Sequence, residues 1–199
     1  IVAEPESRNT APAIISTIAF LYNTNPDDFV IVMPSDAYIN DVGLFNEYLN
    51  DLLKDYSGNK IISFGIVPTE PNTNYGYIEK EIDDFNKNSI FSVKQFEEKP
   101  KIELALKFFQ DKNFLWNSGI FVGKISIIYN LFKKYNPNLF KNILNSVKNA
   151  ENTEKILYLN RYFYSRCENI SIDYSFMEKI NQNELCVLQL NLEWKDLGT

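Results

Sequence analysis

The sequence predicts an α/β domain built on a mixed, mainly parallel sheet that is flanked by helices. Apolar runs without polar alternation, at 29–33 and 60–67, are typical of strands that are buried on both faces. Segments with apolar residues at helical spacing, at 10–22 and 43–56, alternate with these runs. This strand–helix alternation is the sequence signature of a parallel sheet with helices on its faces.

The rest of the chain predicts a smaller antiparallel and helical part. Residues 75–79 and 89–96 resemble an antiparallel strand pair joined by a polar loop at 84–88. Further strands are expected at 115–124 and 185–190. Helices are expected at 102–110, 126–135, 139–147 and 151–163.

Composition excludes several classes of function. The net charge of −6 argues against a nucleic-acid partner or an anionic membrane, since phosphate groups are held mainly by Lys and Arg. The chain has no His, which excludes Ser/His/Asp and Cys/His hydrolases and His-ligated zinc. Two Cys residues are too few for a disulfide framework, so we expect a cytoplasmic protein. No apolar run approaches the roughly 20 residues of a membrane span.

The two ends of the sequence suggest a piece of a longer protein. The chain starts at Ile1 without an initiating Met, in what resembles a strand, and it stops abruptly after Lys195–Thr199. No basic region followed by an apolar stretch is present at the start, so the sequence does not begin with a signal peptide.

Asp36 is the first candidate for chemistry, because it follows the apolar run at 29–33. Ligands of open α/β sheets bind at the carboxyl ends of the strands, and a carboxylate there is a natural ligand for Mg²⁺. The alternative is that Asp36 only caps the turn before Ala37 and Tyr38.

Three other polar groups lie where elements begin or end. Arg8, Asn9 and Thr10 precede a helix, whose N-terminus suits anions, although ordinary capping explains them equally well. Lys99 could reach a phosphate and Glu98 could accept hydrogen bonds from sugar hydroxyls, although a solvated charge run is the commoner explanation. Asn117 lies beside a Gly that allows close approach of the backbone.

These motifs and several others recur in an order that resembles a known family. The segments in question are Glu4–Ala13, Pro34–Asp36, Phe64–Thr69, Tyr75–Ile78, Phe96–Pro100, Trp116–Phe121, Ser171–Glu178 and Trp194–Gly198. Together they resemble the bacterial mannose-1-phosphate guanylyltransferases, or GDP-mannose pyrophosphorylases, of the sugar nucleotidyltransferase family. The Arg-Asn-Thr-Ala-Pro-Ala, Trp-Asn-Ser-Gly and Ser-Ile-Asp-Tyr runs are the family-specific ones.

The resemblance implies a Rossmann-like nucleotidyltransferase fold and a transfer of GMP from GTP to mannose 1-phosphate. It implies that Asp36 and Asp196 hold Mg²⁺ and that Lys99 holds the sugar phosphate. The residues implied to line the mannose are Gly76, Glu98, Asn117 and Asp173. Glu4 would face guanine, with Arg8, Asn9 and Thr10 near the nucleotide. Residues 1–70 would form the nucleotide-binding half of a single domain, and residues 71–199 would form its sugar-binding half. A homo-oligomer is possible and is left open.

The sequence also departs from the family pattern. The usual His after the strand-end Asp is Ala37, and the usual Gly before Tyr75 is Asn74. The glycine-rich N-terminal signature, which follows a central strand in related folds, is absent from the 199 residues. We therefore expect the strand at 29–33 to lack a neighbour and the nucleotide to lack its phosphate cradle. Two alternatives stay open, a catalytically impaired fragment and a related pyrophosphorylase with another sugar or nucleotide.

Overall fold

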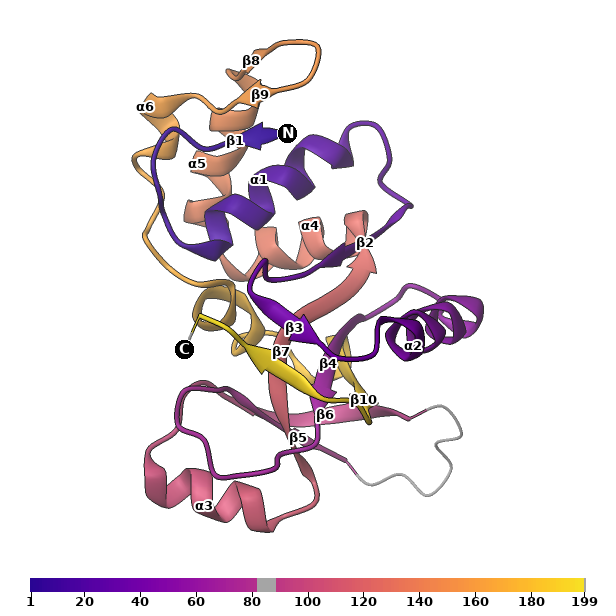
Figure 1. Ribbon diagram of the computed structural model, residues 1–199. Helices are drawn as coiled ribbons and strands as arrows, with labels where there is room; N and C mark the ends of the chain where they lie inside the picture. The colour runs from indigo at the N-terminus through magenta and orange to yellow at the C-terminus, as the bar shows by residue number, and fades with distance from the viewer. Residues whose placement is uncertain (82–88, 199) are drawn as a thin grey trace. The chain divides into compact units, whose positions relative to one another are not determined.

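The structure, a computed structural model, describes residues 1–81 and 89–198, which form two compact units (Figure 1). The first unit comprises residues 1–30 and 124–180, and the second comprises 31–123 and 181–199. The loop expected at 84–88 lies outside the described residues. The division of one domain at residue 70 into a nucleotide half and a sugar half stays a prediction.

The first unit is mainly helical. Its elements are β1 (Val2–Ala3), α1 (Thr10–Tyr22), α4 (Ile125–Tyr135), α5 (Pro137–Lys148), β8 (Glu151–Asn152), β9 (Leu157–Tyr158) and α6 (Arg161–Tyr164). Helices α1, α4 and α5 pack together around buried side chains that include Ile15, Phe132 and Ile143. Pro137 opens α5, where its missing N–H leaves no hydrogen bond unmade. None of the helices within the described ranges combines the length and the apolar character needed to cross a bilayer.

The prediction of a helix at 151–163 is wrong. Residues 151–158 form a hairpin of β8 and β9 instead, and β9 pairs in parallel with β1. The turn is closed locally, because the Thr153 N–H donates to the Ile156 carbonyl at 2.9 Å and the Ile156 N–H donates to the Thr153 hydroxyl at 3.1 Å. The backbone pairing with β1, which is remote in the sequence, outweighs the local helical pattern.

Among the described residues, the second unit holds a six-stranded sheet, a two-stranded sheet, two α-helices and a short 3-10 helix at Gln182–Glu184. Its strands are β2 (Phe29–Val32, shared with the first unit), β3 (Ala37–Ile39), β4 (Ile61–Ile66), β5 (Tyr77–Lys80), β6 (Ile90–Glu97), β7 (Phe114–Lys124), β10 (Leu185–Leu190) and β11 (Trp194–Asp196). Its α-helices are α2 (Val42–Asp55) and α3 (Ile102–Gln110).

The α/β class is confirmed, but the mainly parallel sheet is wrong. The strand order is β2-β7-β4-β10-β6-β5, and β5 also pairs with β7, so that five strands close into a ring. Strand β10 runs parallel to β4, whereas β4–β7, β5–β7, β5–β6 and β6–β10 are antiparallel. The alternation of β2, α2 and β4 suggested neighbouring parallel strands. The structure instead inserts β7, which comes much later in the sequence, between β2 and β4.

The two strands formed by the apolar runs, β2 and β4, differ in how far they are buried. All six residues of β4 are buried, as predicted for a strand covered on both faces. None of the residues of β2 is buried, because β2 lies at the edge of the sheet and β7 is its one hydrogen-bonded neighbour among the described residues. The prediction that the strand at 29–33 is buried on both faces is therefore wrong.

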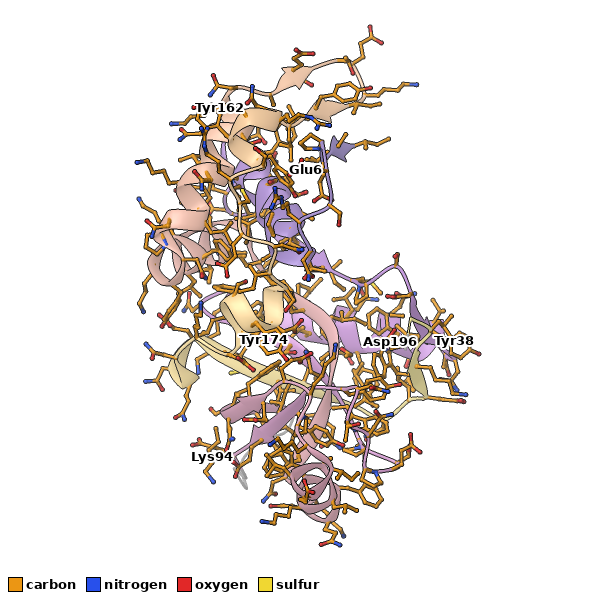
Figure 2. All side chains as sticks on the ribbon, turned by 90° about the vertical axis from the view of Figure 1, so that its left-hand side faces the viewer. Glu6, Tyr38, Lys94, Tyr162, Tyr174 and Asp196 are labelled. Carbon is orange, nitrogen blue, oxygen red and sulfur yellow. The ribbon has the colours of Figure 1, made fainter. Side chains whose placement is uncertain are left out.

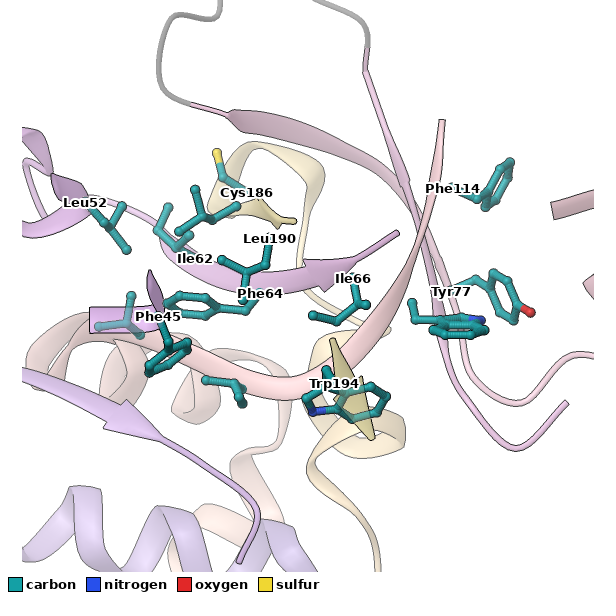
Figure 3. Packing of buried hydrophobic residues seen from close by; sticks show 14 of the residues in the cluster. Phe45, Leu52, Ile62, Phe64, Ile66, Tyr77, Phe114, Cys186, Leu190 and Trp194 are labelled. Carbon is teal, nitrogen blue, oxygen red and sulfur yellow. The ribbon is translucent and has the colours of Figure 1, made fainter. Parts of the chain in front are cut away.

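The core of the second unit includes side chains of the sheet and of both helices, α2 and α3. Phe45 and Leu52 from α2 pack against Ile62 and Phe64 of β4, and the rings of Phe45 and Phe64 are 5.7 Å apart (Figure 3). This packing covers one face of β4, the strand that pairs with β7 at Asn117.

Gly65 of β4 leaves no room for a side chain. A methyl group built on Gly65 would lie 2.7 Å from Leu115 Cδ1 and 2.7 Å from Val187 Cγ2. We expect Gly65→Ala to lower the free energy of unfolding by about 1–3 kcal/mol, measured by urea denaturation, because it overpacks the sheet. Gly43→Ala is the control, since its methyl group would meet only Asp41 Oδ1 at 3.3 Å. Equal stability of the two variants would contradict this account of the core.

Candidate functional site

Asp36 and Asp196 lie beside each other at the ends of two paired strands. Strands β3 and β11 are antiparallel, with Asp196 opposite Ala37. The Leu197 N–H donates to the Asp36 carbonyl at 3.0 Å, which continues the pairing past the strands. Figure 2 shows Asp196 close to Tyr38, the residue opposite Lys195 in the register.

The two carboxylates converge on Gly198. A methyl group built on this glycine would lie 2.6 Å from Asp36 Oδ2 and 3.2 Å from Asp196 Oδ1. The Gly198 N–H donates to Asp196 Oδ1 at 2.8 Å and holds that carboxylate in place. A side chain at this position would displace one of the two carboxylates, a constraint that the sequence motif alone did not reveal.

This pair of carboxylates fits a magnesium ion. Within residues 1–81 and 89–198, no group of three or more His, Cys, Asp or Glu side chains is arranged to hold a metal. Mg²⁺ commonly takes one or two protein carboxylates and completes its shell with water and substrate phosphates. Two converging carboxylates, which offer hard oxygen donors, match that pattern.

Three of the four predicted sugar-binding residues also come together. A methyl group on Gly76 would collide with the Glu98 carboxylate and would lie 3.3 Å from Asn117 Cβ. The Asn117 N–H donates to the Gly76 carbonyl at 2.8 Å. Asn117 Oδ1 accepts from the Gly119 N–H at 3.2 Å and from Ser63 Oγ at 3.4 Å. The result is a small polar cluster around a buried glycine.

A distortion within β7 connects this cluster to the aspartate pair. Ser118 Oγ donates to the Phe64 carbonyl at 2.6 Å, and the pairing of β7 with β4 shifts register in this region. Gly119 has a φ of 72°, and a methyl group on it would lie 3.0 Å from Pro34 Cγ. Because Pro34 is two residues before Asp36, the Asn-Ser-Gly turn packs directly against the segment that carries the first aspartate.

Lys99 is exposed and conformationally strained. Its φ of 46° is in the left-handed region, and Pro100 follows it, so its backbone is doubly restricted. Its Nζ lies 3.9 Å from Glu98 Oε1. Strained non-glycine residues cluster at functional sites, so this geometry is consistent with the predicted role of Lys99.

A pocket of about 920 Å³ adjoins Asp196 in the second unit. Tyr75 makes edge contacts with Trp116 and Trp194, with ring centroids 5.1 Å apart in each case, and all three rings line the pocket. No role is predicted for these three aromatic residues from the sequence. The signal was present, because Tyr75 and Trp116 stand directly before the predicted site residues Gly76 and Asn117, and Trp194 stands two residues before Asp196.

The predicted nucleotide residues lie in the first unit. Asn9 caps α1, with its Oδ1 accepting from the Thr10 N–H at 2.8 Å, and its φ of 66° is also left-handed. The Thr10 hydroxyl accepts from the Ile172 N–H at 2.9 Å. Asp173 follows at the start of a π-helical turn, Asp173–Met177, a feature that often marks functional sites. Asp173 is thus close to Asn9 and Thr10, while the other three sugar residues belong to the second unit.

Arg8 and Glu4 are held by the chain itself. Arg8 Nε and Nη2 donate to Glu6 Oε1 at 2.8 and 2.5 Å, and Nη2 also donates to the Ser165 carbonyl at 2.7 Å. The Glu4 carboxylate accepts a hydrogen bond from the hydroxyl of Tyr164, a residue that the sequence analysis missed. Arg8 therefore has a structural task, and its contact with a nucleotide stays a prediction.

Comparison with known proteins gives a consistent family. A family model described as nucleotidyl transferase matches residues 1–199. The chain is 32% identical to the alginate biosynthesis protein AlgA of Pseudomonas fluorescens, covering all of this chain and 41% of that protein. It is 30% identical to a mannose-1-phosphate guanylyltransferase of Escherichia coli, covering all of this chain and 43% of that protein. The chain therefore spans about two fifths of the length of these relatives.

Solved structures show the same fold. A Helicobacter pylori structure described as mannose-6-phosphate isomerase matches with a TM-score of 0.85 and 28% identity, covering 98% of this chain and 73% of that one. A Thermus thermophilus structure described as mannose-1-phosphate geranyltransferase matches with a TM-score of 0.82 and 26% identity, covering 98% of this chain and 53% of that one. A UDP-glucose pyrophosphorylase, with a TM-score of 0.54 and 14% identity over 97% of this chain and 59% of that one, shares the fold alone.

The contribution of Arg8 to folding can be tested by measuring the free energy of unfolding. Arg8→Ala removes the partner of Glu6 and of the half-buried Ser165 carbonyl, so we expect it to lower the free energy of unfolding by about 1–3 kcal/mol. Arg8→Lys should recover only part of this loss, because an ammonium group lacks the forked donors of guanidinium. Urea denaturation measures both, with the exposed Lys141→Ala on α5 as the control. A loss no larger than that of Lys141→Ala would show that Arg8 is free for another role.

Proposed function

Since the chain belongs to the nucleotidyl transferase family, we propose that the protein transfers GMP from GTP to mannose 1-phosphate, releasing pyrophosphate and forming GDP-mannose. Relatives of about 30% identity that carry the name mannose-1-phosphate guanylyltransferase support this choice of substrates. The activity is assigned to the full-length protein as encoded.

The convergence of Asp36 and Asp196 on Gly198 is the observation that carries the proposal. It brings two acidic side chains, separated by most of the sequence, to one point beside a polar cluster of Gly76, Glu98 and Asn117. The contact of Gly119 with Pro34 links the two groups within one unit. A site that must hold a metal near a sugar phosphate needs these two parts close together.

The chemistry suits a chain without His. The phosphate monoester of mannose 1-phosphate is already anionic at neutral pH, so its oxygen attacks the α-phosphorus of GTP without a general base. A new P–O bond forms as the bond to the β,γ-pyrophosphate breaks, and pyrophosphate leaves as an anion. Catalysis then consists of aligning two anions and neutralising their charge.

Each candidate residue has a part in this alignment. Asp36 and Asp196 would hold Mg²⁺, which when bound supplies neutralisation of the phosphate charge. Lys99 would hold the sugar phosphate, while Glu98, Asn117, Asp173 and the Gly76 backbone would orient the mannose hydroxyls. Glu4 would accept the two adjacent N–H groups of guanine, with Asn9, Thr10 and Arg8 near the nucleotide.

Pyrophosphate release tests the substrates directly. With Mg²⁺, the full-length protein should release pyrophosphate when it is given GTP and mannose 1-phosphate together, and not with either alone. Preference for ATP, for UTP or for glucose 1-phosphate would instead identify a related pyrophosphorylase, and no activity with any pair would identify an impaired fragment.

The aspartate pair is tested by substitution. Asp36→Asn and Asp196→Asn should each lower kcat on the order of 100-fold or more, because a ligand of the metal is lost while the shape is kept. Gly198→Ala should raise the Mg²⁺ concentration needed for half-maximal activity, because the added methyl group pushes the two carboxylates apart.

Asp51→Asn is the matched control for these variants, since Asp51 is an exposed carboxylate on α2 paired with Lys54. Its kcat and Mg²⁺ dependence should equal those of the unmodified protein. Unchanged turnover in Asp36→Asn or in Asp196→Asn would remove that residue from the metal site.

A further inference from the structure

Tyr164 is a fully buried residue whose one polar atom is directed at Glu4. The side chain has no exposed surface, and its hydroxyl donates to Glu4 Oε1. Burial raises the pKa of the Tyr164 phenol, and the hydrogen bond to Glu4 raises it further, so the phenol keeps its proton. Glu4 itself is exposed, so a buried donor holds a carboxylate that faces solvent.

The backbone on both sides of Glu4 is fixed as well. Ala3 pairs with Tyr158, and the Ala3 carbonyl accepts from the Leu159 N–H at 3.0 Å. The Pro5 carbonyl accepts from Arg161 Nη2 at 2.9 Å. With its main chain tied before and after it and one oxygen bonded by Tyr164, Glu4 has little freedom left.

We infer that Tyr164 is a positioning residue that sets the selectivity for the base by fixing the Glu4 carboxylate before the nucleotide binds. This inference rests on the proposed use of GTP. Guanine presents two adjacent donors, N1–H and the 2-amino group, and an oriented carboxylate accepts both. Each carboxylate oxygen has two acceptor positions, so Oε1 accepts from Tyr164 and from the base at once.

The energetic reason is preorganisation. A freely rotating glutamate loses conformational freedom when it binds a base, and this lowers affinity. A carboxylate already held by Tyr164 has lost that freedom during folding. This gain in affinity is complete only for a base that donates both hydrogen bonds to the oriented carboxylate. We therefore expect selectivity for guanine over hypoxanthine, which lacks the 2-amino group.

The experiment compares GTP with ITP on the full-length protein. Tyr164→Phe keeps the buried ring and removes only the hydroxyl. We expect it to raise the KM for GTP about 3- to 10-fold with kcat unchanged, and to lower the GTP/ITP ratio of kcat/KM by a similar factor. Tyr162→Phe is the matched control, since Tyr162 lies on the same helix α6 and is 62% exposed. It should leave the ratio unchanged.

A double-mutant cycle separates positioning from a general effect on packing. In a Glu4→Gln background, Tyr164→Phe should cause no further change in the GTP/ITP ratio, because the carboxylate is already absent. Glu4→Asp, at an exposed position, shortens the reach to Tyr164 and should reproduce the loss of selectivity on its own. This second variant keeps the test valid if Tyr164→Phe folds poorly.

The outcomes are distinguishable from a failure of the proposed function. If the unmodified protein does not use GTP, the proposed function and this inference fail together. If it uses GTP but Tyr164→Phe or Glu4→Asp keeps the full GTP/ITP preference, only the positioning role is overturned. An equal effect of Tyr164→Phe with and without the Glu4 carboxylate would also overturn it.

Discussion

The pairing of β7 is the constraint on which the second unit depends. This eleven-residue strand is hydrogen-bonded to β2, β4 and β5, so it both closes the ring of strands and holds the edge strand β2. Its break at Asn117–Gly119 is stabilised by the Ser118 hydroxyl on the Phe64 carbonyl and relies on the left-handed φ of Gly119. One local distortion thereby orients the Asn117 side chain and brings Gly119 against Pro34, so both halves of the candidate site derive their position from the same turn.

Backbone strain falls on candidate site residues. Within the described part of the chain, three residues other than glycine have a positive φ, namely Asn9, Ser89 and Lys99. Asn9 begins helix α1 and Lys99 follows the Glu98 cluster, so two of the three stand at predicted ligand contacts. Such conformations cost of order 1–3 kcal/mol each and persist where the surroundings over-determine them. The fold therefore loses stability at positions where substrate contacts are expected, and the buried cores of the two units offset that loss.

Local chemistry in the sequence was enough to predict the helices α1 to α5 and the buried strand β4. The residues that converge at Gly198 and Gly76 were predicted as a set only through the resemblance to a known family. Prediction from local sequence failed where pairing with a segment far along the chain determines the secondary structure or the strand order. Residues 151–158 carry a helical pattern, yet their backbone pairs with Val2 and Ala3. The insertion of β7 between β2 and β4 has the same origin. Tyr164 could not have been found, since a buried aromatic at helical spacing is typical of a core residue, and only its contact with Glu4 distinguishes it.

The aromatic cluster around Tyr75 has a practical consequence for spectroscopy. The chain contains two tryptophans, and both Trp116 and Trp194 flank Tyr75 in the second unit. Tryptophan emission therefore reports on the second unit alone, whereas far-ultraviolet circular dichroism sees the helices of the first unit as well. Denaturation curves recorded by the two signals will coincide if the units unfold in one cooperative transition and will separate if they unfold independently.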